Sequence, residues 1–366
     1  MLASGRSSFI LKHYYYEIPY WVFIFVLFVL VRFSGLAEAF HDVQIYQDRN
    51  ITAQIMVGVV GGIFLGGLMA TSRLFLLKKV CYKLSVGRSI IFQTISALIL
   101  LTVTIIIISQ IFFYHFNYSS LHISNFFSHT YTRSSLLILY GYFIYASIQY
   151  NLLIETDKKL GINVLKNLII GKYHTPRQEE RIFMFMDLKS STTIAEELGH
   201  LKYSRFLQDV YKLLTDVVID KKAEIYQFVG DEVVLSWPSA TGYQDNNTLQ
   251  FFYAFQAILE ENKSYFISNY NTTPIFKAGI HRGVVSVAEV GEINTQIAYH
   301  GDVVNTTSRI QELCNKYKSH LLVSDNFMKG MEAPLLNFQE NAAEITLRGR
   351  SQPIIIYALD VAVPTI

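Results

Sequence analysis

Cysteine is nearly absent from this chain. Its 366 residues include only Cys81 and Cys314, which lie far apart in segments that we place in the cytoplasm. A disulfide framework and a CxxC metal site are therefore excluded, and we expect two ordinary reduced thiols. A net charge of one sign is also lacking: the formal net charge is +2, and no basic stripe with interleaved aromatic residues stands out. Nucleic acid is accordingly not expected as a partner.

Charged residues are scarce as well. They make up 16% of the chain, whereas hydrophobic residues make up 51%, and the mean hydropathy is +0.28. This composition is too apolar for an ordinary soluble protein of this length. The apolar excess lies before about residue 155, and the charged residues lie mainly after it. We therefore predict a transmembrane domain over residues 1–154 and a cytoplasmic part after it.

Four apolar segments are long enough to cross a bilayer, since a spanning helix needs roughly 20 predominantly apolar residues. No span has an acidic residue or a histidine at its centre, which is the usual mark of an ion pathway, so transport is disfavoured. Glycines in the second span have small-xxx-small spacings, which indicate helix packing, within the chain or between chains. The predicted spans are residues 19–36, 53–77, 90–113 and 135–154.

The positive charges orient these spans. Lysine and arginine crowd the connection between the second and third spans, whereas the loop at residues 38–48 is acidic. The positive-inside rule then places both termini in the cytoplasm of a multi-pass protein embedded in the lipid bilayer. Residues 155–180 are charged and have leucine and valine at helical spacing, which predicts a linker helix. Such a helix transmits a signal or merely connects the two parts, and the sequence leaves both readings open.

The cytoplasmic part alternates strands and helices. A strand-like run at residues 181–186 ends in Asp187, and a second at 224–229 reaches Gly230–Asp231 before a third at 232–237. A Gly–Asp pair between two apolar runs predicts a hairpin. The remaining predicted elements are helices at residues 192–199, 203–219 and 249–269 and a pair of strands at 276–282 and 283–290. This order is typical of an α+β ferredoxin-like sandwich, with helices on one face of an antiparallel sheet.

Asp187 and Asp231 are the first candidate site residues. In a ferredoxin-like core the end of the first strand and the turn of the central hairpin lie side by side, so the two carboxylates can converge. Adjacent carboxylates repel unless a cation lies between them, and hard oxygen ligands suit Mg²⁺ or Mn²⁺ shared with substrate phosphates. Taken singly, a strand-end aspartate is also a common helix cap, and Gly–Asp a common turn.

Three further elements carry candidate phosphate-binding residues. The polar turn after Asp187 opens a helix, whose free N–H groups suit a triphosphate. Asn305 and Arg309 are four residues apart and thus share a helix face, where a guanidinium can meet a phosphate or simply face solvent. Arg348 and Arg350 flank a glycine before a predicted strand and bind outer phosphates or decorate a turn. The residues of the polar turn are Leu188, Lys189, Ser190, Ser191 and Thr192.

In this order and spacing the four elements resemble the class III adenylate and guanylate cyclases, over roughly residues 177–360. The segments that carry the resemblance are Phe185-Met-Asp-Leu-Lys-Ser-Ser-Thr192, Phe228-Val-Gly-Asp231, Gly301-Asp-Val-Val-Asn305 with Arg309, and Leu347-Arg-Gly-Arg350. The resemblance implies a catalytic domain over residues 181–366 that converts ATP into cyclic AMP. It also implies a bacterial inner (cytoplasmic) membrane protein, since bacterial members commonly attach varied spans before this domain.

The resemblance also implies roles for these residues. Asp187, Asp231 and the backbone carbonyl of Leu188 would hold two Mg²⁺ or Mn²⁺ ions per site. Asn305 would orient the ribose, and Arg309 would neutralise the α-phosphate. Arg348 or Arg350 would hold the outer phosphates, and Ser190, Ser191 and Thr192 of the polar turn would belong to the substrate-binding set. Members of the family build each site from two subunits, so a homodimer with shared sites is implied.

The base-reading positions depart from the family. Adenylate cyclases commonly have lysine four residues before the second aspartate and aspartate or threonine seven before the asparagine, and guanylate cyclases have glutamate and cysteine there. This chain has Gln227 and Ala298. A flipping amide can face adenine or guanine. We expect ATP, because adenylate cyclases are the commoner bacterial form. Guanylate cyclase activity and a non-catalytic nucleotide-binding membrane receptor or scaffold are the alternatives.

Overall fold

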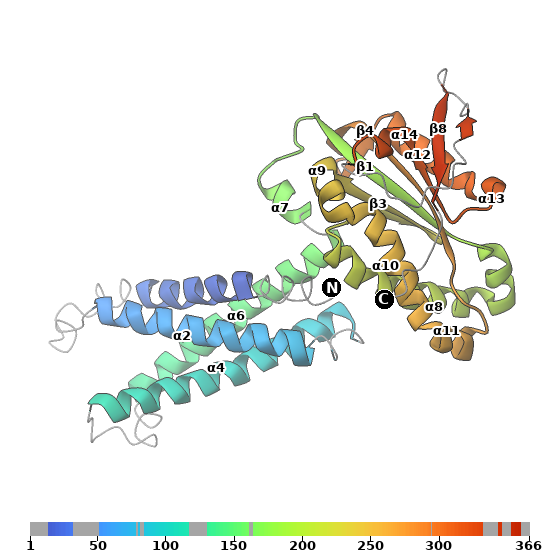
Figure 1. Cartoon of the computed structure of the whole chain (residues 1–366). Helices are drawn as coiled ribbons and strands as arrows, with labels where there is room; N and C mark the ends of the chain where they lie inside the picture. The colour runs from blue at the N-terminus through green and yellow to red at the C-terminus, as the bar shows by residue number, and fades with distance from the viewer. Residues whose placement is uncertain are drawn as a thin grey trace. The chain divides into compact units, whose positions relative to one another are not determined.

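The computed structural model describes residues 14–31, 51–77, 80, 84–116, 130–160, 164–293, 295–331, 343–345 and 353–359. The chain divides into two compact units, with the boundary between Lys159 and Leu160 (Figure 1). We call them the membrane unit and the catalytic unit. Cys81, Arg348 and Arg350 lie outside the described residues.

Within the described residues, four long apolar helices build the membrane unit, as the hydropathy predicted. Their stretches with enough length and hydropathy to cross a bilayer are Tyr14–Val31, Ile55–Phe75, Val86–Ile108 and Leu137–Asp157. These helices indicate a multi-pass membrane protein. After the first helical segment, the elements are α2 (Ile51–Ser72), which continues as the π-helical turn η2 (Arg73–Leu77), α4 (Val86–Phe116) and α6 (Thr130–Leu160).

The glycines of α2 pack against the first helix. A Cβ atom on Gly62 would lie 2.5 Å from Val22 Cα, and one on Gly66 would lie 2.8 Å from Ile18 Cα. Only glycine permits so close an approach of two helix backbones. The predicted packing role of the glycine cluster is therefore confirmed, as a contact within one chain.

A buried ion pair joins the four helices of the membrane unit. Glu17 of the first helix is fully buried, and its carboxylate accepts hydrogen bonds from Arg73 and from Trp21 Nε1, the latter at 3.1 Å. The Arg73 guanidinium also donates to Gln93 of α4 and, at 3.1 Å, to Asn151 Oδ1 of α6. Each helix thus contributes at least one polar side chain to a single network, in surroundings where such groups are costly unless they are paired.

Replacing Arg73 with methionine is expected to destabilise the membrane unit by about 3–5 kcal/mol, because the substitution leaves the Glu17 carboxylate buried without its counter-ion. Thermal unfolding of the detergent-solubilised chain measures the loss. The double variant Glu17→Gln with Arg73→Met removes both charges and should recover part of it. An unchanged melting temperature for the single variant would show that the pair contributes nothing to stability.

In the described part of the catalytic unit, an eight-stranded sheet forms the centre. Its order is β2-β3-β1-β4-β6-β8-β7, with β5 paired to β4 beside this path. All pairs are antiparallel except β4 with β6. The strands are β1 (Arg177–Leu188), β2 (Glu224–Val229), β3 (Glu232–Pro238), β4 (Phe276–Val290), β5 (Gln296–His300), β6 (Leu321–Ser324), β7 (Ala343–Ile345) and β8 (Ile354–Ala358).

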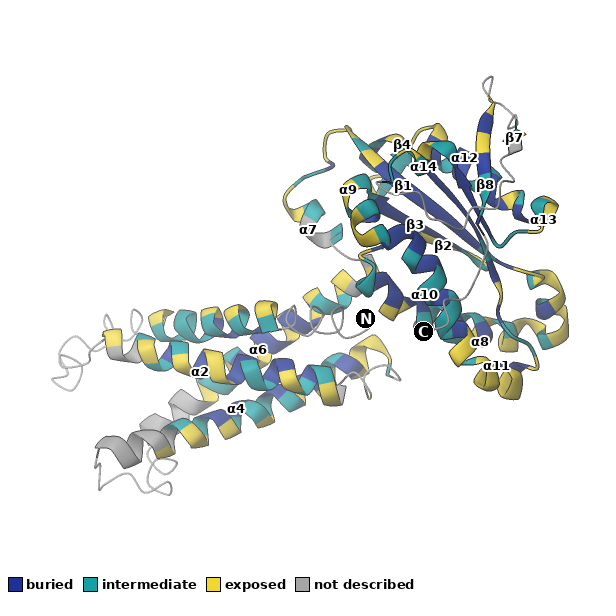
Figure 2. Cartoon of the chain, viewed as in Figure 1, coloured by how far each residue is buried: buried dark blue, intermediate teal, exposed yellow. Residues whose placement is uncertain are grey.

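One face of the sheet is covered by helices and forms the main core (Figure 2). Ile182, Met184 and Met186 of β1 point to this face, and their alternation with residues 181, 183, 185 and 187 follows the strand period of two. The second face has a smaller apolar cluster around Phe183 and Phe185. The helices of the catalytic unit, of which α12 lies against the second face, are α7 (Val164–Ile169), α8 (Ser191–Asp220), α9 (Ser239–Tyr243), η3 (Gln244–Asn246), α10 (Asn247–Glu261), α11 (Lys263–Tyr270), α12 (Asp302–Glu312), α13 (Cys314–Tyr317) and α14 (Asp325–Met328).

The α+β fold class predicted from the sequence is confirmed, and so is the hairpin at Gly230–Asp231, which joins β2 to β3. The prediction of two strands that meet at Gly283 is wrong, because β4 continues through it to Val290 and pairs with β5 instead. Gly283 serves packing rather than a turn. A Cβ atom there would lie 2.6 Å from Val303 Cγ2 of α12.

Helix α12 approaches the second face of the sheet at Gly283 and at Gly279. At the latter, a Cβ atom would lie 2.5 Å from the backbone nitrogen of Gln311. The predicted helix at residues 249–269 is two helices, α10 and α11, which are separated at Asn262. Helix also occupies part of the predicted linker, since α6 continues to Leu160 and α7 covers Val164–Ile169.

Candidate active site

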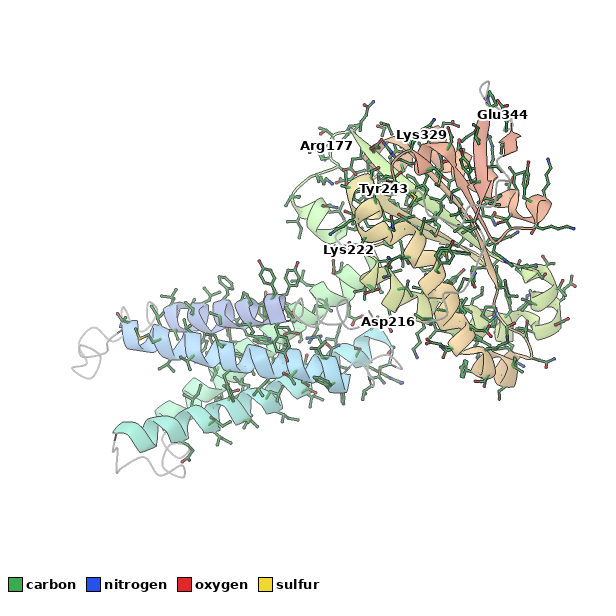
Figure 3. All side chains as sticks on the ribbon, in the orientation of Figure 1. Arg177, Asp216, Lys222, Tyr243, Lys329 and Glu344 are labelled. Atoms are coloured by element: carbon green, nitrogen blue, oxygen red, sulfur yellow. The ribbon has the colours of Figure 1, made fainter. Side chains whose placement is uncertain are left out.

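The site is built at the end of β1. This strand begins at Arg177, which Figure 3 labels. It ends at Leu188, and Asp187 is its penultimate residue. The ladders place Glu232 of β3 opposite Asp187 on one side and Lys277 of β4 opposite it on the other. Asp231 lies in the hairpin turn after Gly230, whose φ of 63° is the left-handed conformation that glycine adopts readily.

The structure brings Asp187 and Asp231 together. Burial raises the pKa of the Asp187 carboxyl, Lys277 opposes this, and the neighbouring Asp231 carboxylate raises the pKa further. A cation between two neighbouring, half-buried carboxylates would offset their mutual repulsion, so the pair suits a cation site. The convergence expected from the order of the strands is therefore present in the fold.

Three further residues, which the sequence did not predict, lie beside the two aspartates. Lys277 Nζ lies 3.1 Å from Asp187 Oδ2, and Gln311 Nε2 of α12 donates to the same oxygen at 3.3 Å. Glu232 follows Asp231 directly. A lysine in a strand and a glutamine in a helix carry no local signal. They can be identified only once the register of β1 with β4 and the packing of α12 against the sheet are known.

Glu232 makes the stability of the protein depend on pH. Burial raises its pKa from 4.5 to about 7, the nearby Asp187, Asp231 and Glu312 carboxylates add to this, and Lys277 opposes it. The folded state thus holds this proton more tightly than the unfolded chain does. The resulting stabilisation is complete below the ordinary pKa of 4.5 and is lost as the pH rises to about 7.

Replacing Glu232 with glutamine should therefore raise the melting temperature at about pH 8 and flatten its fall between about pH 5 and 8. Thermal unfolding across this range, in buffer free of divalent cations, measures both effects. If the variant and the unmodified chain fall in parallel over the range, Glu232 does not carry the pH dependence.

The predicted phosphate-binding turn follows the strand directly. Lys189 N donates to Ile275 O at 2.8 Å, and Ser190 adopts a left-handed φ of 58° as the N-cap of α8. This conformation turns the chain from the strand into the helix, which begins at Ser191. Ser190 and Thr192 are exposed. The N-terminus of α8 therefore opens next to Asp187 and has the free donors that suit an anion.

Asn305 and Arg309 lie one turn apart on α12, with Asn305 exposed and Arg309 half-buried. Within the part of the chain that the structure describes, no hydrogen bond or ion pair links either residue to Asp187 or Asp231. The structure thus groups the two aspartates but does not join them to the predicted ribose and α-phosphate residues. Gln227 of β2 is exposed, and Ala298 of β5 is half-buried opposite Ala288.

The donor set fits a hard divalent cation. Among the described residues no group of three or more histidine, cysteine, aspartate or glutamate side chains forms a metal cage. Two convergent carboxylates with a nearby backbone carbonyl suit an ion that takes its remaining oxygens from water and phosphate, as Mg²⁺ does. Zinc-type sites need a closed shell of protein ligands and do not match this arrangement.

Comparison with known proteins decides the family. Residues 174–360, which are more than half of the chain, match the adenylate and guanylate cyclase catalytic domain. The chain belongs to this cyclase family. Residues 174–360 thus form a domain of the class III cyclase family, which uses divalent metal ions, and apolar helices precede this domain.

This cyclase is similar to several adenylate cyclases. It is 30% identical over 200 residues to adenylate cyclase 2 of Rhizobium meliloti (strain 1021), which covers 55% of each chain. It is 24% identical over 204 residues to the adenylate cyclase of Anabaena cylindrica, which covers 53% of this chain and 38% of the relative. The chain thus matches about half or less of the length of these relatives.

One solved structure supports the fold. A bacterial light-regulated adenylyl cyclase superposes with a TM-score of 0.51 at 17% sequence identity, over 62% of this chain and 65% of the other. A sequence identity of 17% supports a shared fold and nothing beyond it.

Proposed function

We propose that this cyclase converts ATP into 3′,5′-cyclic AMP and pyrophosphate at the cytoplasmic face of a bacterial inner membrane, in signal transduction. The convergence of Asp187 and Asp231 within a cyclase-family fold carries the proposal. The curated relatives named above, which are adenylate cyclases, support the choice of ATP. In the reaction the ribose 3′-oxygen bonds to the α-phosphorus while the bond from this phosphorus to the bridging oxygen of pyrophosphate breaks. The hydroxyl proton passes to solvent.

Asp187, Asp231 and the carbonyl of Leu188 would hold two Mg²⁺ or Mn²⁺ ions. When bound, these ions supply the positive charge that favours the 3′-alkoxide and the departing pyrophosphate. Lys277 and Gln311 both contact Asp187 Oδ2, and so they orient this carboxylate before any cation binds. The ammonium group of Lys277 also adds positive charge at the place where the triphosphate must lie.

The other predicted residues act on the nucleotide itself. Asn305 orients the ribose by hydrogen bonding, and Arg309 offsets the charge that grows on the α-phosphate in the transition state. The open N-terminus of α8, at Ser190, Ser191 and Thr192, receives the triphosphate. Arg348 and Arg350 hold the outer phosphates in this proposal, which rests on the sequence for these two residues.

We infer that two chains complete each site. Within one described chain, no hydrogen bond or ion pair joins Asn305 or Arg309 to the two aspartates. A homodimer in which the aspartates of one chain face Asn305 and Arg309 of the other satisfies this geometry and gives two equivalent sites.

Base selection is assigned to Gln227 and Ala298. Replacing Gln227 with glutamate, together with Ala298→Cys, should lower ATP turnover and raise GTP turnover. A carboxylate accepts hydrogen bonds from guanine N1–H and its amino group but faces the lone pair of adenine N1. The ratio of kcat/KM for the two nucleotides measures the change. Glutamate at the neighbouring exposed Lys222 is the control. If the ratio stays that of the unmodified enzyme, these positions do not read the base.

A non-catalytic nucleotide-binding receptor is the second candidate function. Gln227 and Ala298 match neither specificity pattern of the family, which favours this alternative. Such a protein would bind nucleotide without turnover, so a product assay with ATP and with GTP separates the two functions.

A further inference from the structure

A fully enclosed arginine ties four strands of the catalytic unit together. The side chain of Arg181 on β1 is only 1% exposed. Its Nη1 donates to Glu179 Oε2 at 3.0 Å, and its Nη2 donates to Ser236 Oγ of β3 at 3.0 Å and to the Glu224 carboxylate of β2. Its guanidinium carbon lies 5.0 Å from the centre of the Tyr299 ring on β5. Arg181 points to the same sheet face as Asp187, by strand alternation.

Strand β2, which carries Gln227, is irregular just before that residue. Ile225 pairs with Leu235 and Gln227 pairs with Val234, so Tyr226 is one extra residue in the ladder, a β-bulge. Without this bulge Gln227 would pair with Val233, whose side chain lies in the helix-covered core. A shift of one residue moves a side chain to the opposite face of a sheet. The bulge therefore decides whether Gln227 faces the second sheet face, on which Asp187 lies.

Arg181 supports this bulge through two separate contacts, one with Glu224 and one with Tyr299. Its ion pair with Glu224 fixes the residue two positions before the bulged Tyr226. Its guanidinium packs on Tyr299, whose ring meets the Tyr226 ring edge-on at a centroid distance of 4.9 Å. Tyr299 directly follows Ala298, the other base-reading position. One side chain thus supports both strands to which base selection is assigned.

Stability alone does not account for an arginine at this place. Burying an ion pair costs about as much in desolvation as the pairing returns, and apolar residues of similar volume often serve equally well. Among the described residues, Arg181 Nε has no hydrogen-bond partner, which adds to the cost. Only the planar, forked guanidinium group of arginine makes directional contacts to three other strands at once. Its contribution is one of geometry.

We propose that Arg181 is a positioning residue for base selection, which locks the β2 bulge so that the Gln227 amide and the Ala298 position face the purine of the bound nucleoside triphosphate. The inference rests on the function proposed above and extends it. Arg181 itself does not touch the nucleotide. Without the Arg181 side chain, β2, which is an edge strand, can change register, and the Gln227 amide then loses its fixed orientation.

The test compares full-length Arg181→Met with full-length Arg181→Lys and with the unmodified enzyme. For each, kcat/KM is measured with ATP and with GTP. We expect Arg181→Met to reduce the preference for ATP at least about tenfold, mainly through a higher KM for ATP. Arg181→Lys keeps the charge but loses the fork, and we expect it to restore the preference only in part. Hydrogen exchange at the β2 amides should be faster in Arg181→Met.

Two further variants keep the test decisive. Glu224→Gln weakens the same ion pair by changing a partly exposed residue, and we expect it to shift the preference in the same direction as Arg181→Met. It replaces Arg181→Met in the test if that variant does not fold. Phe206→Leu is the matched control. It weakens the core on the other sheet face and should leave both the preference and the β2 exchange unchanged.

An ATP to GTP preference within twofold of the unmodified enzyme in both Arg181→Met and Glu224→Gln, with unchanged β2 exchange, would overturn the inference but leave the proposed function standing. An equal shift in Phe206→Leu would also overturn it, since the effect would then be one of general stability. If the unmodified enzyme turned over neither nucleotide, the proposed function would fail, and this inference with it.

Discussion

Replacing Asp187 with alanine is expected to lower nucleotide turnover by about a thousandfold or more. The substitution removes one of two convergent carboxylates and leaves Lys277 without its partner at 3.1 Å. A positioned divalent cation stabilises transition-state charge by several kcal/mol, and about 4 kcal/mol corresponds to a thousandfold in rate. The measurement is the rate of cyclic nucleotide formation by the purified full-length variant with saturating Mn²⁺.

Asp209→Ala is the matched control for this prediction. Asp209 also lies in the catalytic unit, and it accepts hydrogen bonds from Tyr265 and Tyr270 at 2.7 and 2.5 Å. Among the described residues, no hydrogen bond links it to Asp187 or Asp231. We expect this variant to fold and to keep its turnover near that of the unmodified enzyme. Turnover that survives in Asp187→Ala at ordinary metal concentrations would remove the aspartate pair from the mechanism.

Mixing two inactive variants is expected to restore activity. Arg309→Met should lose about a hundredfold to a thousandfold in turnover, because it deletes a cation aimed at charge that develops in the transition state. In the proposed homodimer, a chain with Asp187→Ala and a chain with Arg309→Met together retain one site whose aspartates and arginine are all intact. Equal amounts of the two chains, co-expressed and purified, should give about a quarter of the normal activity.

The control for the mixing experiment is a chain that carries both substitutions, co-expressed with the Asp187→Ala chain. No pairing of these two chains contains an intact site, so the activity should stay at background. If the mixture of the two single variants also stays at background while dimers form, Asp187 and Arg309 act within the same chain.

The aspartate pair could be predicted because both of its members carry local signals. Asp187 follows a strand-like run, and Asp231 follows a glycine between two such runs, so topology alone brings them together. Their neighbours could not be found in this way. Lys277 reaches Asp187 through the register of β1 with β4, and Gln311 reaches it only because Gly279 lets α12 lie close to the sheet.

Gly283 shows why local patterns fail at one point of the fold. A glycine between two apolar runs predicts a turn, as it does correctly at Gly230. At Gly283 the absent Cβ atom makes room for Val303 instead, and β4 runs on. A glycine that bends the backbone and a glycine that admits a neighbour look the same in a sequence.

In the membrane unit, too, one feature could be predicted from the sequence and another could not. Hydropathy alone predicts four helices, because length and apolar composition are local properties. The pairing of Glu17 with Arg73 was not predicted, since Glu17 precedes the predicted start of the first span. A charged residue near the end of a helix usually faces the membrane surface. Only the packing of four helices shows that these two charges are buried together.

The most direct test of the central claim is a product assay. The purified full-length protein is incubated with ATP or with GTP in the presence of Mn²⁺ or Mg²⁺, and the products are separated and identified by mass. We expect 3′,5′-cyclic AMP and an equal amount of pyrophosphate from ATP, in a reaction that stops when the metal is chelated. Nucleotide binding without any cyclic product, from either nucleotide and at any metal concentration, would contradict it.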